Sequence, residues 1–337
     1  MPRPAWRARI TLSAAAFPVA LAALGLAGAA AAGRAATPGA PPAQAQAPEF
    51  SETAYEGTVP VVAEYRFRMA GKVRPLLFFW ITRDGVGGAR FRVRRGEDGA
   101  YGYDLLIGSD PARAPRGINR WGSILEETRG GTTTVVGVMK KSDEETLGEA
   151  ESNVDRERQG GVVYKMIQAS VTRVESVARV TIATLARDYT YRELGALMAA
   201  MAADHSAPRI RVTPTPPGGR PGLLTSVAEL LRDGVETVRR TGRAPGSRSL
   251  PYVYYAKQYD VKLASASVEK GASYGGVTYP RLLRASFELR ARGESWTERF
   301  TIACAVDGDE AGAPVFVSYQ PRWWLAVELV RDDRERF

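Results

Sequence analysis

The stretch "LRASFELRAR" (residues 283–292) alternates between apolar and polar side chains at every position. Its odd-numbered residues are apolar, and its even-numbered residues are polar. A period of two residues predicts an extended strand with one buried face and one face in solvent. Such strands are typical of antiparallel sheets, because the strands of parallel sheets are usually apolar on both faces.

The same period recurs nearer the beginning of the chain. In "VVAEYRFRMA" (residues 61–70), Tyr65, Phe67 and Met69 share one face, and charged residues occupy most of the other. "ARFRVRR" (residues 89–95) repeats the pattern, with arginines on the polar face. We therefore expect half-buried strands in both the first and the last third of the sequence.

Short glycine-rich links separate these runs. Asp-Gly and Gly-rich segments of this length are typical of hairpin turns. They predict two β-meanders, one near each end. The links are "RDGVGG" (residues 83–88), "GEDG" (residues 96–99), "RGES" (residues 292–295) and "DGDEAGAP" (residues 307–314).

The segment from Val315 to Leu329 reads as one final strand, with its odd-numbered residues facing the core. This numbering points Trp323 inward and Trp324 outward. An outward tryptophan in a polar row is either a cross-strand packing partner or part of a contact surface. Pro321 cannot donate a hydrogen bond to a ladder, so it marks an edge or a bulge.

Two amphipathic helices are predicted in the middle of the chain. The first begins with a capping box formed by Thr190 and Glu193. The second has the same spacing at Ser226 and Glu229, and it ends at Gly242. "HSAPRIRVTPTPPGGRPG", which lies between them, is predicted to be a linker because of its prolines and glycines.

These elements predict a mainly β protein of the α+β type. Long antiparallel meanders would form a curved sheet or half-barrel, with a two-helix insertion. We expect an N-terminal β-meander over residues 50–186, a helical insertion and linker over 187–247, and a C-terminal β-meander over 248–337 that packs with the first. In layout this is similar to periplasmic lipoprotein carriers and related envelope sensors, whose open β-surface holds an acyl chain or a partner.

Residues 1–45 are predicted to be a signal peptide and the start of a disordered lead-in. Arginines precede an apolar run from Ile10 to Leu26, and small residues follow, with Ala43-Gln44-Ala45 and Ala27-Gly28-Ala29 as alternative cleavage sites. We expect the mature protein in the periplasm or outside the cell. Four of the arginines lie in this region and no acid does, so the formal charge falls from +9 to 9 − 4 = +5. No later run predicts a transmembrane span.

Few catalytic chemistries fit this composition. His205 is the sole histidine, and it falls in a predicted loop; Cys304 is the sole cysteine, and it falls on the apolar side of a strand. We therefore predict no catalytic triad, no metal site and no cofactor, and nucleic acid is not an expected partner. Local acid clusters such as Glu126-Glu127 leave open a hydrolase that uses two carboxylates.

The leading hypothesis is a non-enzymatic cell-envelope binding protein for a lipid or another apolar ligand. The alternative is a structural or assembly partner that docks through Trp324 and the loop from Arg113 to Arg120. The first hypothesis rests on inward aromatic residues, which could equally form a filled core: Tyr65, Phe67, Phe79, Trp80, Phe287 and Trp323. The second rests on possible partner or anion contacts, which could equally be a solvated loop with Trp121 at the core edge: Arg113, Arg116, Arg120, Trp121 and Trp324.

Overall fold

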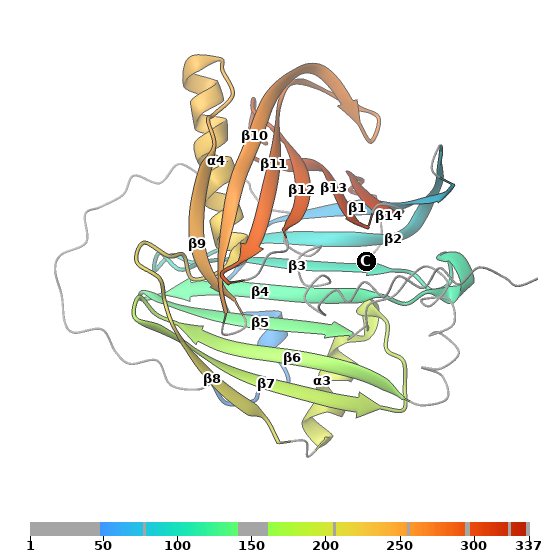
Figure 1. Cartoon of the computed structure of the whole chain (residues 1–337), viewed down its shortest axis with the longest axis vertical. Coiled ribbons are helices and arrows are strands. Elements are labelled where there is room, and N and C mark those ends of the chain that lie inside the picture. Colours follow the sequence, from blue (N-terminus) through green and yellow to red (C-terminus); the bar gives the residue numbers. More distant parts are fainter. Residues whose placement is uncertain are drawn as a thin grey trace, which may run out of the picture.

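The computed structural model describes residues 48–76, 79–140, 161–204, 207–254, 257–293, 297–322 and 325–334. One antiparallel sheet of 14 strands contains every strand of these segments. It is strongly curved and barrel-like (Figure 1). The expected fold class, a curved antiparallel sheet with a two-helix insertion, is therefore confirmed.

The strands follow the chain with one exception. The spatial order is β8-β7-β6-β5-β4-β3-β2-β1-β14-β13-β12-β11-β10-β9, so the first and last strands of the chain pair at the centre. The first eight are β1 (Val61–Leu76), β2 (Phe79–Arg95), β3 (Tyr101–Ser109), β4 (Trp121–Arg129), β5 (Thr132–Lys140), β6 (Val162–Val171), β7 (Glu175–Leu185) and β8 (Arg209–Pro214). The others are β9 (Arg248–Tyr254), β10 (Lys257–Tyr274), β11 (Val277–Ala291), β12 (Glu298–Ala305), β13 (Pro314–Arg322) and β14 (Leu325–Arg331).

The sheet is not closed by a ladder. Among the described residues, hydrogen bonds link the two sides of the opening: Arg220 N–H, in the loop after β8, donates to Pro251 O of the end strand β9 (2.7 Å), and Gln258 Nε2 of β10 donates to Pro214 O of the end strand β8 (2.9 Å). We call the gap between β8 and β9 the seam. In Figure 1, β8 runs along the lower margin of the sheet, well away from most of β9.

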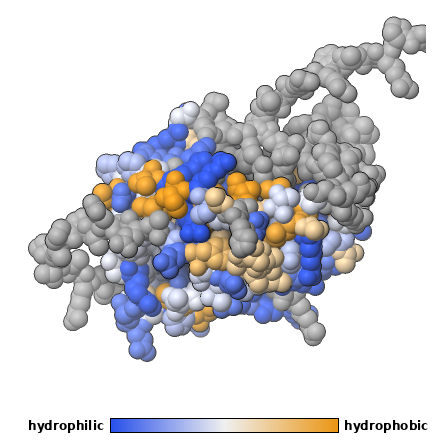
Figure 2. Space-filling model, turned by 90° about the horizontal axis from the view of Figure 1, so that it is seen from below, coloured by the Kyte–Doolittle hydropathy of each residue, from blue (hydrophilic) through white to orange (hydrophobic). Residues whose placement is uncertain are grey.

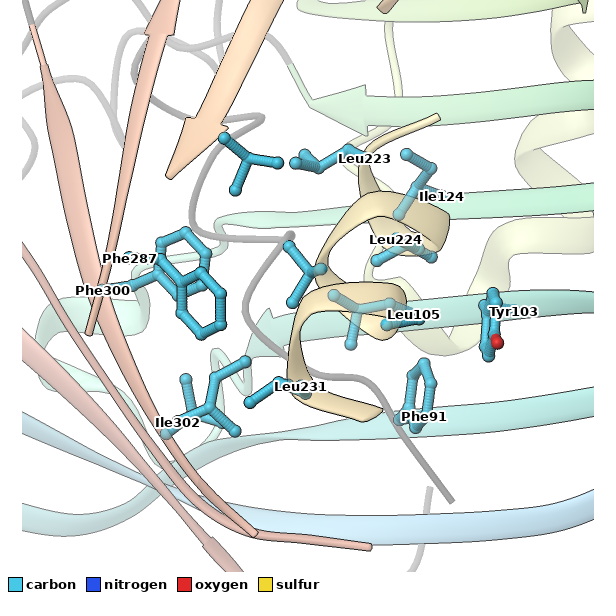
Figure 3. Close-up of a cluster of buried hydrophobic side chains, with 14 of the residues drawn as sticks. Phe91, Tyr103, Leu105, Ile124, Leu223, Leu224, Leu231, Phe287, Phe300 and Ile302 are labelled. Carbon is cyan, nitrogen blue, oxygen red and sulfur yellow. The ribbon is translucent and has the colours of Figure 1, made fainter. Parts of the chain in front are cut away.

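Helix α4 (Leu223–Thr241) fills the space that the sheet encloses. Leu223, Leu224 and Leu231 project from it toward β2–β4 on one side and toward β11 and β12 on the other (Figure 3). The main core cluster takes side chains from α4 and from every strand except β8. The centre of the barrel is thus a packed core, as is usual for small β enclosures.

A second cluster covers the outer face of β3–β7. Its lid is helix α3 (Leu194–Ala203), preceded by a short 3-10 turn η4 (Tyr191–Glu193) whose predicted capping box is present. Leu197 and Met198 of α3 are fully buried against this face. The N-terminal turn η2 (Ala54–Glu56) lies beside the same cluster. One half of the barrel therefore has apolar residues on both of its faces.

One predicted turn and one predicted strand are wrong. Residues 83–88 do not end a hairpin but form a bulge inside β2, where Ala70 pairs with Asp84 and Met69 with Gly87. The left-handed φ of Gly85 (67°) accommodates the extra residues. The predicted final strand is in fact two strands, because β13 ends at Arg322 and pairs back onto β14 from Leu325. Trp323 and Trp324 lie outside the described residues.

The linker and the second capping box also need correction. The predicted linker contains strand β8, with the sequence "RIRVTP" (residues 209–214). Its alternation of polar and apolar residues was overlooked because prolines and glycines surround it. Helix α4 begins at Leu223, so Ser226 and Glu229 lie within it rather than at its start. Its end at Gly242, with a left-handed φ of 70°, is as predicted.

Candidate functional site

The aromatic residues predicted to line a ligand site are packed against protein. Tyr65, Phe67 and Phe287 belong to the main core cluster, and their exposed fractions are 7%, 0% and 1%. Phe287 stacks on Phe300, with ring centroids 5.0 Å apart (Figure 3). Trp80 is half-buried in β2. The side chain of Phe79 and all of Trp323 lie outside the described residues.

The arginines of the predicted contact loop lie in different surroundings. Arg113 pairs with Asp110 (3.0 Å), and Arg120 is buried, with its Nη1 donating to Asn119 O (3.0 Å). Arg116 belongs to a short 3-10 turn, η3 (Pro115–Gly117), and nothing is described of its side chain. Trp324 lies outside the described residues, so the docking of a partner through it and this loop stays a prediction.

Trp121 is buried in the second cluster, on the outer face of β3–β7, and does not face solvent. It is 1% exposed, and its indole N–H donates to Tyr189 O at 2.7 Å. Asp188, the residue before, accepts hydrogen bonds from Lys140 Nζ (2.9 Å) and Asn119 Nδ2 (2.8 Å). Lys140 is completely buried. These contacts hold the turn before α3 against the sheet.

The adjacent acids Glu126 and Glu127 serve separate structural roles on opposite faces of β4. Glu126 is buried at the start of α4, where it accepts hydrogen bonds from Leu224 N–H, Thr225 N–H and Thr225 Oγ1, each at 2.9 Å. Burial raises its pKa, against the opposing effect of these donors. It supplies the cap that α4 lacks in its own sequence.

Glu127 points to the other face of β4. It accepts hydrogen bonds from Thr58 N–H (2.8 Å) and Val59 N–H (2.9 Å), and it lies 3.6 Å from Arg94. Because successive side chains of a strand face opposite sides, the two carboxylates do not act on one substrate. Cys304 is equally committed to the core: it is fully buried, and burial raises its pKa to about 12.

Strand β8 lies at one end of the sheet, and its register shows which of its backbone groups face outward. Thr215 N–H donates to Val174 O (2.9 Å), in register with the pairing of β7 and β8. Hydrogen-bonded pairs recur at every second residue of an antiparallel ladder. Arg209, Arg211 and Thr213 therefore direct their backbone groups toward β7, and those of Ile210 and Val212 point away from the sheet.

Those outward groups have no backbone partner among the described residues. The side chains beside them are exposed, Ile210 by 50% and Val212 by 60%. We call residues 209–213, with the outward backbone groups of Ile210 and Val212, the β8 edge. Figure 2 views the molecule from the side that carries β7, β8 and α3, where apolar surface lies among hydrophilic residues.

The side chains of the β8 edge differ between its two faces. Arg209 and Arg211 lie on the face that continues the barrel interior, because they pair with Val180 and with the core residue Ala178. The apolar Ile210 and Val212 lie on the outer face. The alternation in "RIRV" was visible in the sequence, but nothing there indicated that the strand would end a sheet.

No group of three or more potential metal ligands occurs in the described segments. None of the helices there combines the length and the apolar character needed to cross a bilayer.

Comparisons with known proteins give no family for the chain. No protein-family model matches it, and no curated protein does. Among solved structures it is similar to a beta-barrel-like protein of domain of unknown function DUF1849 from Brucella abortus. That likeness has 9% sequence identity and a TM-score of 0.41, over 82% of this chain and 98% of that chain. We assign no residue role from it.

Proposed function

We propose that the chain is a non-enzymatic binding protein of the cell envelope, which docks an extended segment of a protein partner on the β8 edge. The observation that supports the proposal is the outward-pointing backbone of Ile210 and Val212, flanked by exposed apolar side chains. A free edge of this kind accepts a further strand through main-chain hydrogen bonds, and side chains at alternate positions then select the partner.

The charges of the edge favour one kind of segment. A strand added beside β8 would place alternate residues next to Arg209 and Arg211 on the inner face, and the others next to Ile210 and Val212 on the outer face. Opposite charges across a strand pair stabilise it, and like charges destabilise it. The partner is therefore a segment in which acidic residues alternate with apolar ones.

A second copy of this chain fits the edge less well. Two β8 strands paired antiparallel would bring Arg209 and Arg211 of one copy beside the same residues of the other. That arrangement repels, whereas an acidic strand attracts. A heterologous partner is accordingly the occupant that we propose.

A synthetic peptide that alternates valine and glutamate tests the proposal directly. We expect it to bind and to slow amide hydrogen exchange at Ile210 and Val212, whereas the peptide with lysine for glutamate should not. The variant Val212→Pro should lose binding without losing stability, because that N–H points away from β7 and proline is tolerated at sheet edges. Val277→Lys, at a valine that is 53% exposed on another strand, is the control.

Three outcomes would contradict the proposal. They are binding of the peptide by Val212→Pro as tightly as by the wild type, equal binding of the lysine peptide, and no binding of the valine-glutamate peptide. Sedimentation of the free protein gives a further check. A dimer that Val212→Pro dissociates would identify a second copy as the occupant.

Export is part of the proposal and rests on the sequence of residues 1–45. The intact mass of the protein isolated from its native cells would test it. Loss of the residues up to Ala29 or Ala45, together with recovery from the periplasmic or extracellular fraction, is expected. Recovery of the uncut chain from the cytoplasm would contradict it.

A second candidate function is the carriage of a lipid or another apolar ligand. The favouring observation is the seam, since the enclosing sheet could widen there beside α4 and let a ligand replace part of the helix. Native mass spectrometry of protein purified without detergent, and uptake of a fluorescent fatty acid, are the tests. Absence of both a co-purifying ligand and uptake would rule this function out.

A further inference from the structure

Arginines gather on the outer face of β1 and β2, where no helix of the described structure covers the sheet. The register places Glu64 opposite Arg92 and Arg66 opposite Arg90. The residues between them on both strands face the main core cluster, so these four side chains share the outer face. We call this group of four residues the arginine face.

One acid serves two of its three arginines. Glu64 Oε1 accepts a hydrogen bond from Arg66 Nε at 2.8 Å, and its Oε2 accepts one from Arg92 Nε at 2.7 Å. Three cations and one anion leave the group with a formal charge of 3 − 1 = +2. Both carboxylate oxygens of Glu64 are already occupied by charged donors.

Arg90 is left without a counter-ion. No ion pair involves it in the described part of the chain, and its Nε is buried without a hydrogen-bond partner. The acid on the neighbouring strand, Asp104, is taken by Arg94, whose Nε and Nη2 lie 2.9 and 2.8 Å from the carboxylate. The residue that pairs with Arg90 on β3 is the apolar Leu106.

The partly buried positive charge of Arg90 is unfavourable when no anion is bound. The pKa of Arg90 lies below its usual value, chiefly because burial disfavours the cation and then because Arg92 repels it, with Asp104 and Glu64 acting in the opposite direction. A guanidinium in these surroundings gains more from a bound anion than a solvated surface arginine would. Arg90 is half-buried, so part of the side chain remains within reach of a ligand.

We infer that the arginine face binds a phosphate group. A phosphate monoester carries a charge of about −1.5 to −2 at neutral pH, which balances the +2 of the four residues. Guanidinium groups match phosphate oxygens with paired N–H donors, and three of them stand side by side here. The group could be inorganic phosphate or the head group of an anionic envelope lipid, which offer the same chemistry. This inference is independent of the β8 edge.

The test compares the wild type with Arg90→Gln and with Arg299→Gln. Arg299 is a matched control, because it is a strand arginine that is 75% exposed and already paired with Glu288 at 3.0 Å. Thermal unfolding is followed while inorganic phosphate replaces chloride at constant ionic strength. A ligand that binds only the folded state raises the melting temperature in a saturable way.

We expect a saturable rise for the wild type and for Arg299→Gln. In Arg90→Gln the apparent affinity should fall by about tenfold or more, as expected for loss of a charged hydrogen-bond donor. Without phosphate, Arg90→Gln should melt no lower than the wild type, since it removes an unbalanced charge. An equal response of Arg90→Gln and the wild type to phosphate, or a lower melting point without phosphate, would overturn the inference.

Co-sedimentation with vesicles distinguishes the two sources of phosphate. Vesicles of phosphatidylcholine with phosphatidic acid are compared with vesicles of phosphatidylcholine alone. Binding to the first that Arg90→Gln loses would identify a lipid head group, and a response to inorganic phosphate alone would identify a soluble ligand. No saturable response to either phosphate source would also overturn the inference.

Discussion

Replacing Glu126 with glutamine would test how the helix inside the barrel is held. The carboxylate accepts three hydrogen bonds at the start of α4, from Leu224 N–H, Thr225 N–H and Thr225 Oγ1. A glutamine side chain has one acceptor atom. It can keep the two bonds from Thr225 only if its amide group faces Leu224 N–H, which is itself a donor.

The variant therefore leaves a buried N–H group without an acceptor. Losing a hydrogen bond to a charged group costs about 1.5–3 kcal/mol. Removing the buried negative charge offsets part of that cost, because burial already raises the pKa of Glu126. We expect Glu126→Gln to lower the free energy of unfolding by about 2 kcal/mol at pH 7. Glu126→Ala leaves all three donors unpaired, so its cost should be larger, about 4 kcal/mol.

The raised pKa also fixes the sign of a pH dependence. When the folded pKa exceeds the unfolded pKa, the folded state keeps its proton to higher pH, so unfolding releases a proton between the two values. The resulting stability is present in full below the unfolded pKa of about 4.3 and is lost as the pH rises through the folded pKa. The difference in unfolding free energy between the wild type and Glu126→Gln should therefore shrink with rising pH in that window.

Urea unfolding followed by tryptophan fluorescence at several pH values from about 4.5 to 8 measures both effects. Glu288→Gln is the control, because the surface ion pair of Glu288 with Arg299 should contribute less than about 1 kcal/mol to the free energy of unfolding. A cost for Glu126→Gln no greater than that of Glu288→Gln would refute the reasoning. So would a stability difference that grows as the pH rises.

Three further predictions concern the two cores. The thiol of Cys304, with its pKa raised to about 12 by burial, should not react with Ellman's reagent at pH 8 in the native protein but should react fully in denaturant; rapid native labelling would contradict the packing. Trp121→Phe should cost about 2 kcal/mol in calorimetric stability, because Tyr189 O loses its indole donor; a change within experimental error would show that the bond contributes nothing. Leu231→Ala should cost about 2–5 kcal/mol in urea unfolding, as cavity-forming changes do, and a cost below 1 kcal/mol would mean that α4 is loosely packed.

The sequence predicted the parts of the fold that local periodicity determines. Alternation in residues 61–70 and 283–292 identified strands with the correct inward faces, and Gly242 marked the end of α4. The bulge at residues 83–88 was mistaken for a turn, because a Gly-rich segment has the same composition in both. The break between β13 and β14 was missed because odd-numbered residues face the core in both strands, so the alternation continues across it.

The features that could not be predicted from the sequence depend on contacts between residues far apart in the chain. Glu126 caps a helix that begins 97 residues later in the chain (223 − 126), and no local pattern encodes that contact. The filling of the barrel by α4 likewise depends on how the sheet curves. The β8 edge was hidden because strand order, rather than sequence, decides which strand is left without a neighbour.

Amide hydrogen exchange measured residue by residue tests most directly the claim that α4 is the fixed core of a sheet left open at β8. We expect the amides of residues 227–238 in α4 to exchange only through global unfolding. Ile210 and Val212 should exchange rapidly while Arg211 and Thr213 are protected. Exchange of α4 through a low-energy local opening, or equal protection of all four β8 residues, would contradict it.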